Sequence, residues 1–578
     1  MREQPCRSGL VLIELETRDV PTFYGNQLFP LDSAWNQKIT NAPVASNSDA
    51  IINRIISRHH DQNGNLVPPG LHPDFGNPAV DQALYGIPVN VVDSRTTPFK
   101  QVVFPSPPDG YADESDPVPV PIPDNAVIEG DDWNGPSDPS NPGARGDSHL
   151  LVYDKFTNIL YELGSAARPN ETGFPYGGTK PTGVWGAWGE AVWDLNANTF
   201  RTVGWTSADA AGLPILTGLV RPDEALPVSA GGQGVITHAI RFTVQQTRQE
   251  FVYPASHLTN GATTSDLPRM GERFRLKASF VIPSNWAPEV KAVAQAMKDY
   301  GLIVADNGSD MFFQGTPSDQ WDMEAMLKIQ SAIHANDFEV VDLTPVVTGL
   351  SATSGPTGGG TSVTITGKNF SGAAGRLSVL FGTTPASSIT ILSDTQVVAV
   401  APAHAAGTVD VRVQSGTTVP DSNGGNIFFG YGTSATAAAD QFTFGSSVPP
   451  VPPSPPPPPP PVGALQFLAP AFSVSEDGGS ATIIVQRTGG SFGAVSVHYA
   501  TSNGTATAPG DYAARSGTLT WAAGDTTPKS FTVPIVDDAA VENNETVNLT
   551  LSAPTGGATL GTTSTAVLTI LDNDGTSL

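Results

Sequence analysis

The stretch Val536-Asp-Asp-Ala-Ala-Val-Glu-Asn-Asn-Glu-Thr-Val547 places four carboxylates within nine positions. The four are Asp537, Asp538, Glu542 and Glu545, and a strand-like segment lies on either side of them. Carboxylates this close repel one another unless a cation lies among them, and Ca²⁺ takes about six to eight oxygen ligands, often from an acidic loop. The stretch therefore predicts a calcium-binding loop, the alternative being a solvated acidic rim that binds no ion.

The region around this loop, residues 463–578, has the pattern of a β-sandwich. Short segments alternate apolar and polar side chains and are separated by Gly, Asn and Asp. These segments cover residues 481–486, 495–499, 530–535, 546–551 and 566–570. Residues 344–445 show the same alternation, so we expect two β-sandwiches in tandem.

Residues 463–578 resemble the Calx-beta family, the calcium-binding β-sandwich of sodium–calcium exchangers and many bacterial surface proteins. The resemblance is carried by residues 472–477, 510–512 and 517–521, by the acidic block, and by the closing Leu571-Asp-Asn-Asp574. It implies calcium as the bound ion and the following ligands: Glu476, Asp511, Asp537, Asp538, Glu542, Glu545, Asp572 and Asp574. Asn573 interrupts the aspartate run of the exchangers, which leaves open a smaller number of ions or a weaker affinity.

A proline-rich stretch, residues 446–462, separates the two sandwiches and contains seven consecutive prolines. Such a run cannot form a core, and it predicts an extended polyproline II spacer. The preceding residues 344–445 resemble the IPT/TIG family, which has an immunoglobulin-like fold, through residues 345–356, 358–370 and 379–383. The resemblance implies a structural or positioning role rather than direct binding, since no cluster of ligands stands out in these residues.

Residues 28–343 differ from the two sandwiches because they hold most of the Trp and His residues and mix helical with strand patterns. Apolar residues at helical spacing predict helices over residues 287–300 and 323–333. Hairpins are expected at residues 150–163, at residues 191–203 and around Asn307-Gly308. The expected fold class is therefore multidomain and mainly β: an antiparallel-β-rich α+β domain at 28–343, followed by two immunoglobulin-like β-sandwiches.

The composition excludes several classes of protein. The 578 residues carry 55 acids and 29 bases, a formal net charge of −26, and nucleic acid is no expected partner because phosphate binding needs clustered Lys and Arg. A single cysteine, Cys6, excludes an intramolecular disulfide and a Cys-based zinc site. No long apolar run occurs, so no transmembrane segment is expected, and residues 1–27 are interpreted as an N-terminal tail or export segment.

Tryptophans lie beside carboxylates in residues 184–195, where Trp185, Trp188 and Trp193 accompany Glu190 and Asp194. Indoles stack on sugar rings, and two acids supply the proton transfers of glycoside hydrolysis. In a strand Asp194 points away from the face that Trp193 occupies. The alternative is that these aromatic residues form core and that Asp194 faces solvent.

A second group of candidates follows in residues 204–242, namely Asp209, Arg221, Glu224, His238 and Arg241. A histidine near carboxylates and arginines is able to abstract a proton beside a uronate carboxyl or to act as a general acid or base in hydrolysis. The alternative is that the two arginines form structural ion pairs and that His238 is a core histidine.

Two shorter motifs carry weaker signals. Asp306-Asn-Gly-Ser-Asp310 places two aspartates around a turn, where they are candidates for catalysis, for metal binding or for ordinary turn stabilisation. Asp147-Ser-His149 contains part of a triad without the strand and helix context of a nucleophile elbow.

Two functional hypotheses follow. The first is an extracellular or cell-surface bacterial protein whose N-terminal domain acts on polysaccharide as a hydrolase or lyase, with Glu190, Asp194, Asp209, Glu224 and His238 as catalytic candidates. The second is a non-catalytic adhesion or matrix protein that binds glycans or other surface proteins. Both include a calcium-binding Calx-beta module.

Overall fold

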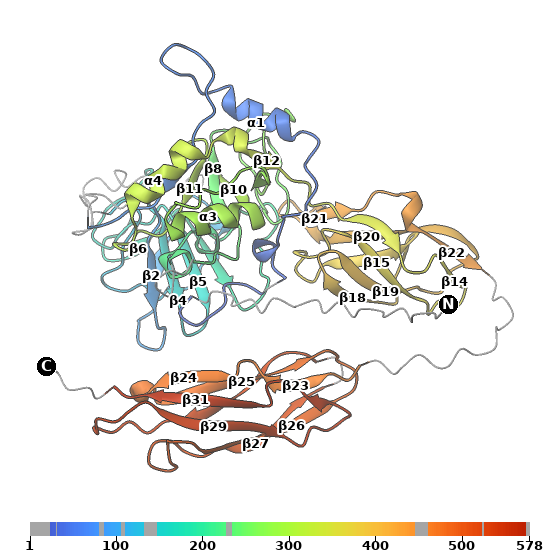
Figure 1. Ribbon diagram of the computed structural model, residues 1–578. Coiled ribbons are helices and arrows are strands. Elements are labelled where there is room, and N and C mark those ends of the chain that lie inside the picture. Colours follow the sequence, from blue (N-terminus) through green and yellow to red (C-terminus); the bar gives the residue numbers. More distant parts are fainter. Residues whose placement is uncertain are drawn as a thin grey trace. The chain divides into compact units, whose positions relative to one another are not determined.

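Strands are the main regular structure of the computed structural model, which describes residues 23–30, 32–79, 86–105, 110–131, 147–226, 234–445, 461–522 and 525–573 (Figure 1). The described residues belong to two compact units, Met1–Val448 and Pro449–Leu578. The multidomain, mainly β fold class is confirmed. The expected export segment falls mostly on residues 1–22, the proline spacer mostly on residues 446–460, and Asp574 on residues 574–578, all of which lie outside the described residues.

A six-stranded mixed sheet organises the N-terminal domain, with the order β1-β11-β8-β10-β9-β12. The strands are β1 His72–Asp74, β8 Ile240–Val244, β9 Arg273–Leu276, β10 Leu302–Asn307, β11 Phe312–Gln314 and β12 Phe338–Val340. Four helices accompany the sheet: α1 Ser48–Ile56, α2 Pro222–Ala225, α3 Pro288–Asp299 and α4 Met323–Ala332. Helices α3 and α4 confirm the helical patterns, and they contact β9 and β1.

A second sheet of the same domain has the order β2-β4-β5-β7. Its strands are β2 Val89–Val92, β4 Leu150–Asp154, β5 Ile159–Gly164 and β7 Gly189–Asp194, and a small pair joins β3 Val102–Val103 to β6 Trp185–Gly186. The β4–β5 hairpin confirms the expectation for residues 150–163. A common hydrophobic core lies between the two sheets and includes Trp193 and Phe242.

Two expected hairpins are wrong. Strand β7 pairs with β5, and residues 199–203 form no strand beside it. Strands β10 and β11, which flank Asn307-Gly308, lie on opposite sides of β8 and do not pair with each other. Strand β8 is buried at all five positions and lies between β11 and β10 in the sheet.

The module at residues 346–445 consists of two sheets, β13-β15-β19-β18 and β14-β22-β20-β16-β17, with β21 paired to β20. The strands are β13 Val346–Leu350, β14 Ser354–Pro356, β15 Ser362–Lys368, β16 Leu377–Phe381, β17 Thr384–Pro385, β18 Ser388–Ser393, β19 Gln396–Val400, β20 Gly407–Pro420, β21 Asn426–Thr433 and β22 Gln441–Gly445. Aromatic residues fix this module to the N-terminal domain within the first unit. Tyr253 packs edge-on against Phe429 and Tyr431, and its hydroxyl donates to the Gly372 carbonyl at 3.2 Å.

The second unit is a β-sandwich with its own core. One sheet has the order β28-β25-β23-β30 and the other β24-β31-β29-β26-β27. The strands are β23 Ala464–Phe467, β24 Ala471–Ser475, β25 Ser480–Thr488, β26 Val495–Asn503, β27 Ser516–Trp521, β28 Lys529–Pro534, β29 Glu545–Ser552, β30 Thr559–Leu560 and β31 Thr565–Leu571. The acidic stretch connects β28 to β29 at one end of the sandwich.

Candidate functional site

Three carboxylates meet at that end of the second unit: Asp511, Glu542 and Glu545. One oxygen of each lies within 4.8 Å of the others, so a single cation is able to contact all three. Asp511 is held beside the acidic stretch because its carbonyl accepts from the Val536 N–H at 3.0 Å. Glu545 opens strand β29, which fixes the position of its side chain.

The charges of these three carboxylates are not neutralised within the sandwich. Burial, followed by Asp511 and Glu542, raises the pKa of Glu545 above its ordinary value. One Glu545 oxygen is buried without a hydrogen-bond partner among the described residues. The basic side chain Lys529 pairs with Asp525 instead. A cation from solution would therefore relieve a repulsion that the protein leaves in place.

The other predicted calcium ligands take different places. Glu476 is buried and acts on the charge of Glu545, and Asp572 accepts a hydrogen bond from the Glu542 N–H at 3.3 Å, so both border the three carboxylates. Asp538 accepts from the Ala540 N–H at 2.7 Å, within its own loop. Asp537 is exposed on the same loop. The structure thus groups part of the predicted set, and the ligand role of every member stays a prediction.

A polar cleft of about 370 Å³ lies in the N-terminal domain. It is lined by residues from distant segments: Asp147 and His149 before β4, Trp188 at the start of β7, residues 206–210, His257, and Asp306 with Asn307 at the end of β10. The strand ends of both sheets therefore contribute to one cavity, and its volume is in the range of small-molecule sites.

Two aspartates of the cleft have contrasting partners. Asp209 is fully buried, and its Oδ2 lies 3.0 Å from the Arg241 Nη2, while its Oδ1 has no hydrogen-bond partner in the described part of the chain. Among the described residues, Asp306 accepts only backbone N–H groups, from Asn307 at 2.6 Å and from Ala210 at 3.5 Å. Burial and the nearby Asp209 raise the pKa of Asp306 to about 7, although Arg241 opposes this shift. Near neutral pH a large fraction of Asp306 is therefore still protonated.

Both ring nitrogens of His149 have hydrogen-bond partners. Its Nδ1 contacts Glu129 at 2.5 Å and its Nε2 lies 2.9 Å from the Ala208 carbonyl oxygen, so both nitrogens donate when the ring is protonated. Burial disfavours the charged ring, but Glu129 outweighs burial and raises the pKa of His149 to about 10. His257 places its Nδ1 2.8 Å from the Ala210 carbonyl oxygen, which leaves the other nitrogen for a ligand.

Aromatic side chains form one wall of the cleft. Tyr176 and Trp188 pack edge to face with their centroids 5.7 Å apart, and the Tyr176 hydroxyl donates to the Asp147 Oδ1 at 2.6 Å. The indole N–H of Trp188 is buried without a hydrogen-bond partner among the described residues. An aromatic wall beside carboxylates is the arrangement that a sugar ring requires.

The five predicted catalytic residues do not gather in one place. Asp209 lines the cleft, whereas Glu224 and His238 form a separate buried pair 3.0 Å apart, in which Glu224 also binds Arg221. Glu190 is buried on β7, where burial raises its pKa to about 8. Asp194 ends β7 and accepts from the Asn196 N–H at 3.0 Å. Their catalytic roles stay predictions.

Sequence reasoning underrated Asp147, His149 and Asp306, which line the cleft. The sequence indicated these residues as candidates through two short motifs, Asp147-Ser-His149 and the aspartates around Asn307-Gly308. Tyr176 had no signal in the sequence, because nothing in its neighbourhood indicates that it lies across from Trp188.

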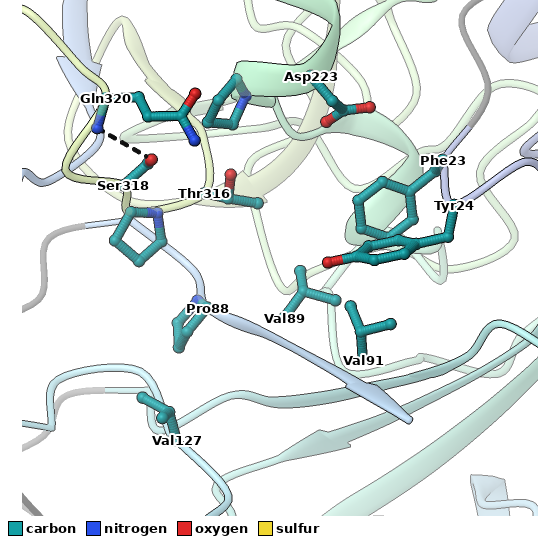
Figure 2. Close-up of a pocket in the computed structure, with 12 residues that line it drawn as sticks. Phe23, Tyr24, Pro88, Val89, Val91, Val127, Asp223, Thr316, Ser318 and Gln320 are labelled. Atoms are coloured by element: carbon teal, nitrogen blue, oxygen red, sulfur yellow. Dashed lines mark hydrogen bonds between the residues drawn. The ribbon is translucent and has the colours of Figure 1, made fainter. Parts of the chain in front are cut away.

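A larger cavity of about 460 Å³ lies elsewhere in the domain and is mostly apolar. Figure 2 shows Phe23 and Tyr24 with Val89 and Val91 near them, while Ser318 and Gln320 lie farther away. Asp223 is the one charged side chain among its described lining residues. Its described lining therefore has fewer side chains that could transfer protons than the lining of the polar cleft.

Among the described residues, no helix is long and apolar enough to span a membrane.

Comparisons with known proteins concern the two sandwiches. A family model described as Calx-beta domain matches residues 461–574, and one described as IPT/TIG domain matches residues 345–431. No family model matches the N-terminal region.

The relatives cover only part of the chain. The adhesion G-protein coupled receptor V1 of Danio rerio is 39% identical over 102 residues, which is 18% of this chain and 2% of the receptor's length. The apo-form Calx CBD1 domain is 31% identical over 19% of this chain and 97% of that one, with a TM-score of 0.19. A Bacteroides ovatus SGBP-B in complex with a mixed-linkage heptasaccharide is 11% identical over 41% of this chain and 48% of that one, with a TM-score of 0.13. The chain thus contains an IPT/TIG domain at residues 345–431 and a Calx-beta domain at residues 461–574.

Proposed function

We propose that this chain is an extracellular or cell-surface protein whose N-terminal domain acts on polysaccharide. The observation that carries the proposal is the polar cleft, whose lining includes the paired Tyr176 and Trp188 rings together with the carboxylates Asp147, Asp209 and Asp306. Aromatic faces bind sugar rings and carboxylates transfer protons, so the cleft has the parts for hydrolysis or elimination. The Calx-beta domain and its similarity to an adhesion receptor support the extracellular location.

The full chain, incubated with neutral and acidic polysaccharides, tests this function. New reducing ends alone would indicate a hydrolase, and reducing ends together with ultraviolet absorbance of unsaturated uronates would indicate a lyase. Tyr176→Ala is expected to weaken retention on the matching polysaccharide gel. Tyr24→Ala is the matched control, because Tyr24 is also an exposed tyrosine, 61% against 52% for Tyr176, and lines the apolar cavity instead.

The alternative is a non-catalytic adhesion or matrix protein, and the similarity to an adhesion receptor favours it. It predicts retention on a polysaccharide gel, or capture of another surface protein, without any product. Neither product nor retention on any gel would contradict the polysaccharide proposal as a whole.

We also propose that the Calx-beta domain binds calcium through Asp511, Glu542 and Glu545. Their oxygens converge within 4.8 Å, and Glu476, Asp537, Asp538 and Asp572 are the further candidates. Calorimetry of the full chain in chelator and in millimolar Ca²⁺ tests this, with residues 449–578 alone to assign the transition of this unit. Extracellular calcium modules bind at about 10⁻⁴ to 10⁻³ M, so the melting temperature is expected to rise in this range. An unchanged melting curve would contradict calcium binding.

A further inference from the structure

The geometry points to a glycosidase site for neutral sugars, in which Asp306 donates the proton to the leaving oxygen and Asp147 activates the attacking water. This inference rests on the proposed action on polysaccharide and specifies its reaction and substrate class. Three observations support it: the lining of the cleft, the hydrogen-bond partners of the carboxylates in that lining, and the buried polar atoms of lining residues that have no partner in the described part of the chain.

Asp306 has the surroundings of a proton donor. It lines the cleft, and its two oxygens accept backbone N–H groups of Asn307 and Ala210, the second at a long 3.5 Å. The charged groups that act on it are Asp209, Arg241, Asp147 and His149. Burial and Asp209 favour its protonated form at neutral pH, which a general acid in glycoside hydrolysis requires.

Asp147 has the surroundings of the complementary base. It is exposed, and it accepts a hydrogen bond from the Tyr176 hydroxyl at 2.6 Å. Its charge contributes to the raised pKa of Asp306, and both residues line the cavity. One carboxyl group that holds its proton and another open to water form the pair that hydrolysis uses.

Two residues that line the cleft each have a buried polar atom without a partner in the described part of the chain, which favours a ligand rich in hydroxyl groups. Asp209 is fully buried, and its Oδ1 has no hydrogen-bond partner in the described part of the chain. A buried carboxylate oxygen is costly to leave unpaired, and a sugar hydroxyl would donate to it. The buried indole N–H of Trp188 would in turn donate to a sugar oxygen.

The cations of the cleft are already engaged, which favours a neutral sugar over a uronate. Arg241 binds Asp209 and Gln314, and His149 binds Glu129. The described residues that line the cavity include no lysine and no arginine. A uronate carboxylate would therefore meet Asp147 and Asp209 with only the second ring nitrogen of His257, among the described lining residues, left to balance it, at a cost that a neutral ring avoids.

The reaction balances with water as the co-reactant. The proton of Asp306 passes to the glycosidic oxygen as its bond to the anomeric carbon breaks. Asp147 takes a proton from the water whose oxygen forms the new bond to that carbon. The products are a sugar with a free reducing end and the released alcohol, and proton exchange with solvent restores both carboxyl groups.

The test uses the full chain with starch, xylan and galactomannan as neutral probes, and alginate and polygalacturonate as acidic ones. Asp306→Asn is expected to lower kcat on the cleaved polysaccharide by about 10²- to 10⁴-fold. The same variant is expected to keep most of its activity on a dinitrophenyl glycoside of the same sugar, because that leaving group needs no proton. Asp147→Asn is expected to lose activity on both substrates. Asp124→Asn, an exposed surface aspartate, is the control.

The pH profile separates proton donation from a structural role. The kcat/KM of the wild type is expected to fall as the pH rises above about 7, where Asp306 loses its proton. That fall is expected for the wild type on the polysaccharide, and it is expected to be absent from the residual cleavage of the same polysaccharide by Asp306→Asn.

Equal cleavage of the polysaccharide by Asp306→Asn and by the wild type would overturn the inference. So would a loss of activity on both the polysaccharide and the dinitrophenyl glycoside in Asp306→Asn with an unchanged melting temperature. Ultraviolet absorbance of unsaturated products from the acidic probes would overturn it as well. The last outcome would leave the proposed action on polysaccharide standing, as a lyase. Binding without cleavage by the wild type would overturn this inference and favour the adhesion alternative. Failure of the polysaccharide proposal itself would instead show as neither binding nor product.

Discussion

In the N-terminal cleft the carboxylates of Asp209 and Glu129 face cations of the protein itself, whereas on the Calx-beta domain Asp511, Glu542 and Glu545 face one another. The first arrangement neutralises charge inside the fold and leaves Asp306 to hold a proton. The second leaves a repulsion that only an ion from solution would relieve. Similar side chains would therefore suit the proposed proton transfer in one region and the proposed metal binding in the other, depending on whether an arginine or histidine lies within reach.

The largest expected effect comes from removing the internal cation of the cleft. Arg241→Met leaves Asp209 buried without its ion-pair partner, and breaking a buried pair from one side costs about 3–5 kcal/mol of unfolding free energy. Urea unfolding of the full chain measures the loss in the transition of the first unit.

Arg54→Met is the matched control for this variant. Its partner Asp266 is 3.8 Å away and both side chains are about two-fifths exposed, so the expected loss is at most about 1 kcal/mol. Equal losses in the two variants would show that Asp209 does not depend on Arg241.

The second effect concerns the external cation of the Calx-beta domain. If calcium binds among the three carboxylates, a hundredfold excess over Kd adds about 2.7 kcal/mol to the unfolding free energy. Glu545→Gln is expected to remove most of this gain, since it takes one charge from the group of three.

Asp525→Asn provides the control within the same domain, because Asp525 pairs with Lys529 and lies outside the three carboxylates. This variant is expected to keep the full calcium gain. Titration of the melting temperature with Ca²⁺ compares the two variants, and an intact gain in Glu545→Gln would place the ion elsewhere.

The same contrast explains how far the sequence predicted each site. The acidic block was visible because Glu542 and Glu545 are neighbours in the chain, and the alternation that set Trp193 against Asp194 is confirmed by the burial of β7. The cleft was not visible because Asp147, Asp209 and Asp306 come from three distant segments. Asp147 precedes β4 of one sheet and Asp306 lies in β10 of the other, so the packing of the two sheets brings these segments together. Local turn signals also predicted a pairing of β10 with β11 that the structure does not have.

The smallest expected effect is a change in how pH acts on the Calx-beta domain. Without calcium, the folded state holds a proton on Glu545 more tightly than the unfolded state, because burial and the neighbouring acids raise its pKa from the ordinary value of 4.5. The folded state then binds more protons, so the stability of this domain is expected to fall as pH rises from about 4.5 through the raised pKa. Saturating calcium needs the ionised carboxylate, and it is expected to reverse this slope, so that stability falls as pH is lowered.

Melting of residues 449–578 between pH 4 and 7, in chelator and in calcium, measures both slopes. Glu545→Gln should reduce the difference between them, and identical slopes in the wild type would mean that no ion replaces the proton on Glu545.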